Sequence, residues 1–276
     1  MEIFGSDAFS PREVARKVEN IGVSKARAPI VETVMLGMLA GGFVGLGGLY
    51  ATLVTADTEM SLAAVRILAG VVFAIGYMMA VLSGAEVFTS NNLLAMSWAA
   101  RKISSFELLR NWTLILLANG IGAFGLVILF LVSGLPAHDN ALLGERALEI
   151  AVTRLSRPFS QVFFLAVLGN LFVCIAAWIA MEGRSITDKI IALILPLSAL
   201  GALDLEHVLA TLYYLPRALM TAAYYPEIAV PGMEVLTWGG FLLNLLAVTL
   251  GNIVGGTFMV ALVYHVVYRY NPRVDD

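Results

Sequence analysis

Six long apolar stretches, separated by short polar segments, dominate the pattern of hydrophobic and polar residues along the chain. Each exceeds the roughly 20 apolar residues that a helix needs to cross the hydrocarbon of a bilayer. The stretches are Val34–Ala56, Ile67–Ala100, Asn111–Ala137, Pro158–Met181, Ile190–Pro216 and Val235–Tyr264. The pattern predicts an all-α membrane protein with six transmembrane helices over residues 29–270, followed by a short tail over residues 271–276.

The second and fifth stretches have polar residues in their middle. A straight helix over Ile67–Ala100 would extend roughly 50 Å at about 1.5 Å per residue, well beyond a hydrocarbon core of roughly 30 Å. This stretch contains the polar run Gly84–Asn92, and Ile190–Pro216 contains Leu203–His207. Irregular backbone at this depth is tolerated only where it is buried in protein or lines a cavity. We therefore expect both helices to be broken.

The two predicted breaks divide the chain into two similar layouts. Each half, about 29–138 and about 158–270, has three spans with the break in its middle span. Three is an odd number, so the halves would face the membrane in opposite directions, an arrangement that recurs in transport proteins. The halves show no strong residue-by-residue similarity, so the inverted repeat is predicted from layout alone.

Residues 1–28 are predicted to form a cytoplasmic amphipathic helix. Ser10 is placed to cap it and Glu13 to close a capping box. Val14 and Val18 share one face, which favours a surface helix lying on the membrane. A role for this helix in gating is the alternative.

Composition and charge support this topology. Hydrophobic residues make up 59% of the chain and charged residues only 13%. With the amino terminus inside, twelve of the 17 Lys and Arg residues fall on the inner side, which predicts cytoplasmic termini and a multi-pass protein of the cytoplasmic (inner) membrane. The net charge of −3, without a large basic block, argues against a nucleic-acid partner. The single cysteine, Cys174, leaves no disulfide framework and no cysteine-based metal site.

The fifth stretch also contains the best candidate for chemistry, His207, preceded by Asp204 and Glu206. A lone histidine in an apolar helix is often a packed, hydrogen-bonded side chain, but ionisable groups inside a membrane usually face a cavity and serve a function. A bare anion in an apolar constriction faces a desolvation cost of several kcal/mol or more. Histidine titrates near physiological pH, so His207 could hydrogen-bond the anion or lend it a proton. Thr89, in the other break, would supply a hydroxyl partner.

Five motifs, in this order, resemble the formate/nitrite transporter family over nearly the whole chain. They are Gly84–Ser90, Leu168–Cys174, Gly183–Lys189, Glu206-His207 and Leu250–Gly256. The resemblance implies an aquaporin-like protomer with its own pore, assembled into a homopentamer. Its partners would be the lipid bilayer, a proton and a small monovalent anion, with formate as the first candidate and nitrite or hydrosulfide as the nearest alternatives. It implies no cofactor, no metal and no catalytic residue.

The resemblance also implies roles for individual residues. His207 and Thr89 would form the pore centre, and Arg154, Asn170 and Glu206 would tune its electrostatics. Apolar constrictions would flank the centre, and the matching positions are Phe73, Tyr77, Val87 and Leu200.

Three positions depart from the family pattern. Arg154 stands where lysine is usual and cannot deprotonate in a protein, Asp204 replaces a common glycine, and Thr211 replaces an asparagine. If Asp204 faces the cavity of His207, it would repel anions. The alternative is that Asp204 pairs with Arg154 or Arg217.

Three further functions stay open from the sequence. A pore for neutral solutes, with His207 structural, predicts flux that ignores pH and membrane potential. A non-transporting scaffold predicts no flux at all. An enzyme is least favoured, because the sequence has no metal cluster, no nucleophile with an adjacent base and no phosphate loop.

Overall fold

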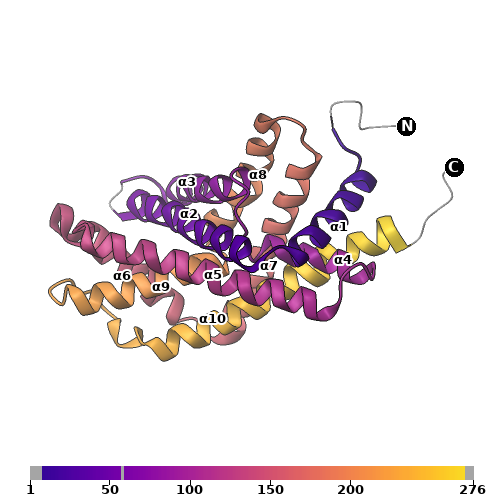
Figure 1. Ribbon diagram of the computed structural model, residues 1–276. Helices are drawn as coiled ribbons and strands as arrows, with labels where there is room; N and C mark the ends of the chain where they lie inside the picture. Colours follow the sequence, from indigo (N-terminus) through magenta and orange to yellow (C-terminus); the bar gives the residue numbers. More distant parts are fainter. Residues whose placement is uncertain (1–7, 57–58, 271–276) are drawn as a thin grey trace.

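The computed structural model describes residues 8–56 and 59–270. Within these ranges the chain is helical, without a strand, and one isolated bridge joins Ala8 to Gly183. Figure 1 shows the long helices side by side in an elongated bundle. Helix α1 (Pro11–Arg27) and the end of the last helix lie towards one end, and α6 (His138–Leu155) lies towards the other.

The helices follow one another in two comparable series. The first consists of α1, α2 (Ile30–Ala56), α3 (Leu62–Leu82), the short 3-10 helix η1 (Ser90–Leu94), α4 (Ala95–Ala99) and α5 (Ser105–Val132). The second consists of η2 (Leu135–Ala137), α6, α7 (Phe159–Glu182), α8 (Ile186–Ala202), α9 (Val208–Tyr224), η3 (Met233–Val235) and α10 (Trp238–Ile253). The last helix continues, partly with wider π-helical turns, through η4 (Val254–Ala261), α11 (Leu262–His265) and η5 (Val266–Tyr270).

Both predicted breaks are confirmed. The second predicted span ends as a helix at Leu82 and becomes helical again only at Ser90. The fifth ends at Ala202 and resumes at Val208. In each case the interruption coincides with the polar residues that the sequence places in the middle of an apolar run.

Several helices are long and apolar enough to cross a membrane. Among the described residues these are Ile30–Ala56, Leu62–Leu82, Ser105–Val132, Phe159–Glu182 and Trp238–Arg269. The fifth predicted span is instead divided into α8 and α9, with 17 residues each, which is short for a crossing helix. The count of six spans therefore stays a prediction.

The distribution of side chains is reversed relative to a water-soluble protein. Large apolar residues such as Leu117, Val132 and Leu195 face outwards, each more than 60% exposed. Polar side chains such as Asn119 and Asn170 are fully buried. An apolar exterior around a polar interior is expected where lipid is the solvent.

The two series pack in the same way. Helix α2 contacts α3 and α5, and its counterpart α7 contacts α8 and α10. The two halves meet where α3 packs along α8. The inverted repeat predicted from layout is thus visible in the packing of the helices.

Helix α1 has the predicted capping box but not the predicted surroundings. The Ser10 hydroxyl accepts from the Glu13 backbone N–H, and the Glu13 carboxylate accepts from the Ser10 N–H. Val14 and Val18, 0% and 3% exposed, belong to a core that includes Met96 of α4. The apolar face that suggested a helix lying on the membrane is therefore covered by protein, and each fully buried valine contributes roughly 1.5–3 kcal/mol to this packing.

Candidate functional site

The first break is a buried loop whose backbone groups are bonded by Asn119 of α5. The Asn119 amide oxygen accepts from the Phe88 N–H (3.0 Å), and its nitrogen donates to the carbonyls of Glu86 and Gly37 (both 2.8 Å). Gly84 starts the loop with a φ of 77°, in the left-handed region that glycine adopts freely. The Asn119 side chain therefore bonds backbone N–H and carbonyl groups that the interrupted helix leaves without a helical partner.

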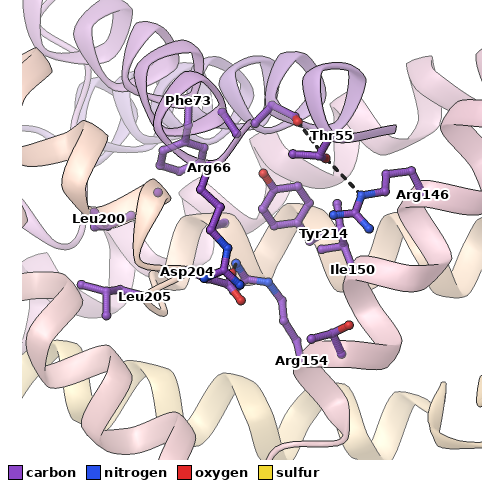
Figure 2. Close-up of a pocket in the computed structure, with 15 residues that line it drawn as sticks. Thr55, Arg66, Phe73, Arg146, Ile150, Arg154, Leu200, Asp204, Leu205 and Tyr214 are labelled. Carbon is purple, nitrogen blue, oxygen red and sulfur yellow. Dashed lines mark hydrogen bonds and ion pairs between the residues drawn. The ribbon is translucent and has the colours of Figure 1, made fainter. Parts of the chain in front are cut away.

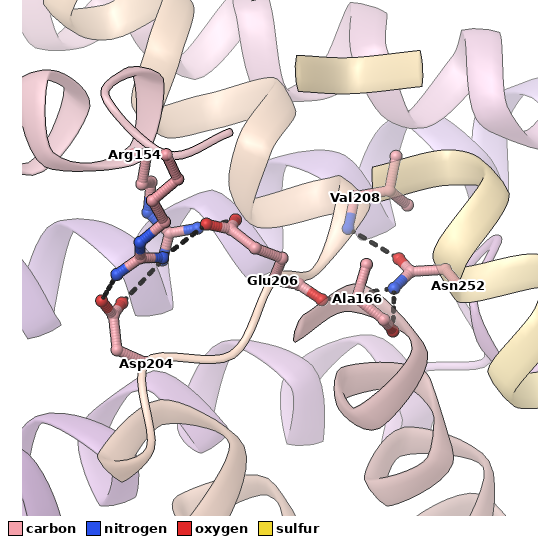
Figure 3. Close-up of polar contacts among 7 residues, drawn as sticks. Arg154, Ala166, Asp204, Glu206, Val208 and Asn252 are labelled. Carbon is pink, nitrogen blue, oxygen red and sulfur yellow. Dashed lines mark hydrogen bonds and ion pairs between the residues drawn. The ribbon is translucent and has the colours of Figure 1, made fainter. Parts of the chain in front are cut away.

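The second break is bonded in the same way by Asn252 of α10. Its amide oxygen accepts from the Val208 N–H (2.9 Å), and its nitrogen donates to the carbonyls of Ala166 (2.8 Å) and Glu206 (3.2 Å). Glycine is required at Gly169 of α7, where a Cβ would lie 2.3 Å from the Glu206 carbonyl oxygen. The loop is thus held from α7 on one side and from α10 on the other (Figure 3).

His207 and Thr89 come from opposite halves and meet between these loops. His207 ends the second break and Thr89 ends the first. The Thr89 hydroxyl oxygen lies 2.9 Å from His207 Nε2, and both side chains are buried. The other ring nitrogen, Nδ1, is also buried, and no hydrogen-bond partner reaches it from the described residues. The structure therefore brings together the two residues that the sequence singles out for the pore centre.

Aromatic and aliphatic side chains surround the imidazole. The rings of Phe73 and Tyr77, both on α3, lie 6.4 Å and 6.2 Å from it, centroid to centroid, in edge-to-face orientations. Val87, in the first break, and Leu200, near the end of α8, are buried as well. All four predicted constriction residues are therefore buried around the two breaks, and Phe73 and Tyr77 contact the histidine directly.

A cavity of about 290 Å³ leads towards this site from the α6 end of the bundle. Its lining residues are Ala51, Thr55, Arg66, Ala69, Phe73, Arg146, Ile150, Thr153, Arg154, Leu200, Gly201, Asp204, Leu205, Ala210 and Tyr214. Phe73 touches both the cavity and the His207 ring, so it separates the two. Leu200 lines the cavity on the opposing half.

The cavity is positively charged. Its lining includes three arginines, Arg66, Arg146 and Arg154, and one carboxylate, that of Asp204. With Arg157, Glu149 and Glu206, which pair with these groups, the excess is one positive charge. Figure 2 shows Arg66 extending from α3 towards Asp204. A basic cleft with low-dielectric walls concentrates anions at its base.

Two arginines and two carboxylates form an ion-pair network across the second break. Arg154 bonds to Glu206 and, at 3.2 Å, to Asp204. Arg157 bonds to Asp204 and, at 2.8 Å, to Glu206. Glu206 is fully buried, so this pairing is what allows its charge to exist there. The four charges cancel, and the network, drawn in Figure 3, ties the loop to α6 and to the residues that follow it.

The network shows which partner Asp204 has. Its carboxylate pairs with Arg154 and not with Arg217, the other partner considered. Asp204 has a φ of 50°, a left-handed conformation that costs a non-glycine residue about 1–2 kcal/mol. The ion pairs with the two arginines offset this cost. Arg154 lies on α6, a separate helix that precedes α7.

Asn170 and Thr211 lie close by but have different environments. Asn170 of α7 donates to the Asn92 side chain and to the Asn252 carbonyl, both at 2.7 Å, and so links α7 to η1 and α10. Thr211 lies one turn beyond His207 on α9. Its hydroxyl is buried, and no described residue hydrogen-bonds to it.

The first break has its own basic partner, which sequence reasoning missed. Lys25 of α1 lies 3.1 Å from the Glu86 carboxylate and donates to Asn91 (2.9 Å), which in turn donates to Glu86 (2.7 Å). Glu86 of the first break thus corresponds to Glu206 of the second, and Lys25 of α1 to Arg154 of α6. The repeat therefore includes α1 and α6, and begins before residue 29.

No metal site accompanies these residues. In the described part of the chain, no group of three or more His, Cys, Asp or Glu side chains is placed to hold an ion.

Comparison with known proteins gives concordant results. A family model described as "Formate/nitrite transporter" matches residues 12–266. The chain is 31% identical over 271 residues to "Formate channel FocA" of Escherichia coli (strain K12), with 95% of each chain covered.

Solved structures with the same fold also match. One is a "Pentameric formate channel with formate bound", with a TM-score of 0.80 and 32% identity, covering 87% of this chain and 97% of that chain. Another is an "FNT family ion channel" with a TM-score of 0.80 and 22% identity, which covers 92% of this chain and 98% of that chain and bears on the fold alone.

Proposed function

This chain belongs to the formate/nitrite transporter family, and on that premise we propose that it conducts formate, one proton with each anion, past His207. The site is a passage and not an enzyme active centre. The observation that carries the proposal is the contact of His207 Nε2 with the Thr89 hydroxyl at 2.9 Å, where the two broken helices meet. An imidazole and a hydroxyl from opposite halves, buried behind aromatic side chains, provide hydrogen bonds where an anion would otherwise have none.

The route begins at the basic cavity. Its arginines raise the local concentration of anions at the mouth, and the ion would then lose its hydration between Phe73 and Leu200. Losing hydration without compensation costs several kcal/mol or more. The Thr89 hydroxyl and the His207 imidazole would offset this cost, because hydrogen bonds to an ionised acceptor are about twice as strong as neutral ones.

Proton transfer completes the mechanism. When His207 is protonated, the N–H bond at Nε2 breaks as a formate oxygen takes the proton, which leaves formic acid and a neutral imidazole. The neutral acid crosses the remaining apolar segment with little electrostatic cost. The imidazole regains its proton from water in the cavity, so one proton accompanies each anion. The paired charges of the network around Glu206 add no net negative charge beside this step.

A pentameric relative supports the proposed assembly, and the positions of the Lys and Arg residues support the proposed topology. The formate channel structure that this chain resembles is pentameric, and the match extends over 97% of its chain. We therefore propose a homopentamer in which every protomer has its own pore. The protein would lie in the cytoplasmic (inner) membrane. The cavity would open to the outer side of this membrane, and both termini would lie in the cytoplasm.

Flux through purified protein in liposomes tests the proposed function. Uptake of formate, nitrite, hydrosulfide and lactate is measured at several pH values. The proposal expects formate to pass faster than lactate, with uptake rising as the pH falls. Nitrite or hydrosulfide passing faster than formate would reassign the substrate within the same route. Solute flux independent of pH and potential would favour a neutral-solute pore, and flux no greater than in protein-free liposomes would favour a scaffold.

A further inference from the structure

Among the described residues, the buried cation Arg217 of α9 has no counter-ion. Its side chain is fully buried, and none of the ion pairs within residues 8–56 and 59–270 includes it. An arginine stays protonated in a protein, and a buried charge is costly unless it is paired. The fold therefore maintains an uncompensated positive charge that the proposed conduction route does not use.

Protein contacts satisfy one side of this guanidinium only. Nη1 donates to the Thr52 hydroxyl (2.9 Å) and to the Tyr213 hydroxyl (3.4 Å). Nε and Nη2 are buried, and neither has a hydrogen-bond partner among the described residues. These two nitrogens share one edge of the planar group. Two parallel N–H donors on one edge are the arrangement that binds both oxygens of a carboxylate.

Aromatic rings hold the guanidinium in place. The ring centroids of Phe130, Tyr213 and Tyr214 lie 5.4 Å, 4.8 Å and 5.2 Å from Arg217 Cζ. Rings at this distance attract a cation through their π faces and shield it from water. They supply no acceptor that could bond the open edge, so the edge remains unpaired in a low-dielectric setting where a bound anion would be held strongly.

Arg217 lies behind the wall of the basic cavity, since it is not itself a lining residue but contacts the Tyr214 ring, which is. Tyr214 lines that cavity, and its ring also lies 5.2 Å from Arg154 Cζ. Thr52, which bonds to Arg217, is one helical turn from Thr55, another lining residue. Figure 2 shows Tyr214 beside Thr55 and Ile150 in the cavity wall. Within the described part of the chain, the Tyr214 hydroxyl donates one hydrogen bond, to the Gly48 carbonyl at 3.3 Å.

We propose that the Nε–Nη2 edge of Arg217 is a second binding site for a small monovalent anion, one with two oxygens on a single atom, such as formate. The anion enters from the cavity as the Tyr214 ring swings aside, and it neutralises the buried charge. The site is distinct from the His207–Thr89 pair. The inference rests on the proposed function only for the identity of the anion, because binding at Arg217 does not require transport.

Crystals of the native protein grown in sodium bromide test the site directly. Bromide scatters anomalously and fits between two N–H donors. We expect an anomalous peak within hydrogen-bond distance of both Nε and Nη2, which formate added to the crystals removes. A map with no peak at this edge overturns the proposal. A peak that formate does not displace is an adventitious ion only and also overturns it.

Melting temperatures in detergent provide the solution test. Sodium formate replaces sodium gluconate at constant ionic strength for the native protein, Arg217→Met, Arg217→Lys and His207→Ala. A ligand that binds the folded state raises the melting temperature with its concentration. Both Arg217 variants should lose part of the formate-dependent rise, and His207→Ala should keep that part. An undiminished rise in both Arg217 variants contradicts the proposal.

The two Arg217 variants separate binding from folding. Methionine removes the unpaired charge, so Arg217→Met should fold without formate at least as well as the native protein. Lysine keeps the charge but lacks the two-donor edge. If liposomes show no formate flux while the Arg217 site binds formate, the proposed function fails and the second site stands. If formate flux is present without binding at Arg217, the second site fails and the proposed function stands.

Discussion

Asn119 and Asn252 make the same three hydrogen bonds in opposite halves of the chain. Each accepts from a backbone N–H of its broken loop, donates to the loop carbonyl two residues earlier, and donates to a carbonyl of a neighbouring helix, α2 or α7. The two loops that contain Thr89 and His207 are therefore held by the same set of amide hydrogen bonds, one set in each half. The geometry of the site depends on these amides, because they bond backbone N–H and carbonyl groups next to Thr89 and His207.

Replacing either asparagine by alanine should destabilise the protein. Each change leaves two buried carbonyls and one buried N–H without their partner, and each such group costs about 1–3 kcal/mol. Asn119→Ala and Asn252→Ala should therefore lose about 3 kcal/mol or more, seen as a lower melting temperature in detergent. Asn244→Ala on the same α10 is the matched control, because its side-chain oxygen has no hydrogen-bond partner among the described residues. Equal melting temperatures for all three variants would contradict the role of the two amides.

Removing the charge of Asp204 should strengthen anion capture. In Asp204→Asn the two arginines share only the Glu206 carboxylate, so the cavity gains one net positive charge. Asparagine tolerates the left-handed φ, so the loop keeps its shape. We expect the KM for formate uptake to fall by about two- to tenfold, with the larger effect at low salt. The exposed Glu145→Gln on α6 should leave KM at the native value. A higher KM in Asp204→Asn would show that the carboxylate helps capture.

Phe73 should determine which solutes pass from the cavity to the histidine. Shortening it to alanine removes the ring that separates the cavity from His207, so lactate uptake should rise relative to formate uptake. A buried Phe→Ala change costs about 3–5 kcal/mol, so Phe73→Leu provides a milder variant that retains packing. Val72→Ala, also buried on α3 but outside the cavity, is the control. An unchanged lactate-to-formate ratio in both Phe73 variants would exclude this residue as the constriction.

The docking of α1 should depend on pH through Glu19. This fully buried carboxylate lies 2.8 Å from Lys102 Nζ, 2.9 Å from Arg269 Nε and 3.7 Å from His265 Nδ1. Burial alone would raise the pKa of Glu19, but hydrogen bonds with Arg269 and Lys102 prevail and lower it below its ordinary value of about 4.5. A lowered pKa means that the ion pairs stabilise docking above about pH 4.5, and that this stability is lost as the pH falls through the lower, folded-state pKa.

Hydrogen exchange of α1 measures this dependence. After correction for intrinsic rates, α1 amides should be protected at pH 7 and lose protection only in acid. Glu19→Gln should lose protection already at pH 7, with α1 amides exchanging about tenfold faster or more. The reason is that hydrogen bonds to a charged group contribute about 1.5–3 kcal/mol to stability. Glu32→Gln, an exposed carboxylate at the start of α2, is the control. Identical α1 exchange in the two variants would exclude Glu19 as the anchor.

The sequence predicted the breaks but not what holds them. Polar residues inside an apolar run indicate directly where a membrane helix is broken. Both breaks, Gly84–Asn92 and Leu203–His207, could therefore be located from the sequence pattern alone. Asn119 carries no such signal, because one amide in an apolar helix has many possible partners. A buried amide that follows each broken span is the feature that could have pointed to both asparagines.

Contacts between distant helices account for the other differences. The amphipathic pattern of α1 shows an apolar face but cannot say whether lipid or Met96 covers it. The sequence did not predict the pairing of Arg157 with Glu206, because that pairing depends on how α6 and the second loop meet. The proximity of Thr89 to His207 was predicted from their places in the two breaks and from the family resemblance, since no periodicity relates residues so far apart.

The central claim is that the His207 imidazole passes a proton to the permeating anion. Formate uptake into liposomes at several pH values, with native protein and His207→Ala in parallel, tests it most directly. Native uptake should rise as the pH falls, and the liposome lumen should become more acidic as formate enters. His207→Ala should lose both the pH dependence and the acidification, and its melting temperature should show that it remains folded. Native-like pH dependence and acidification in His207→Ala would contradict the account.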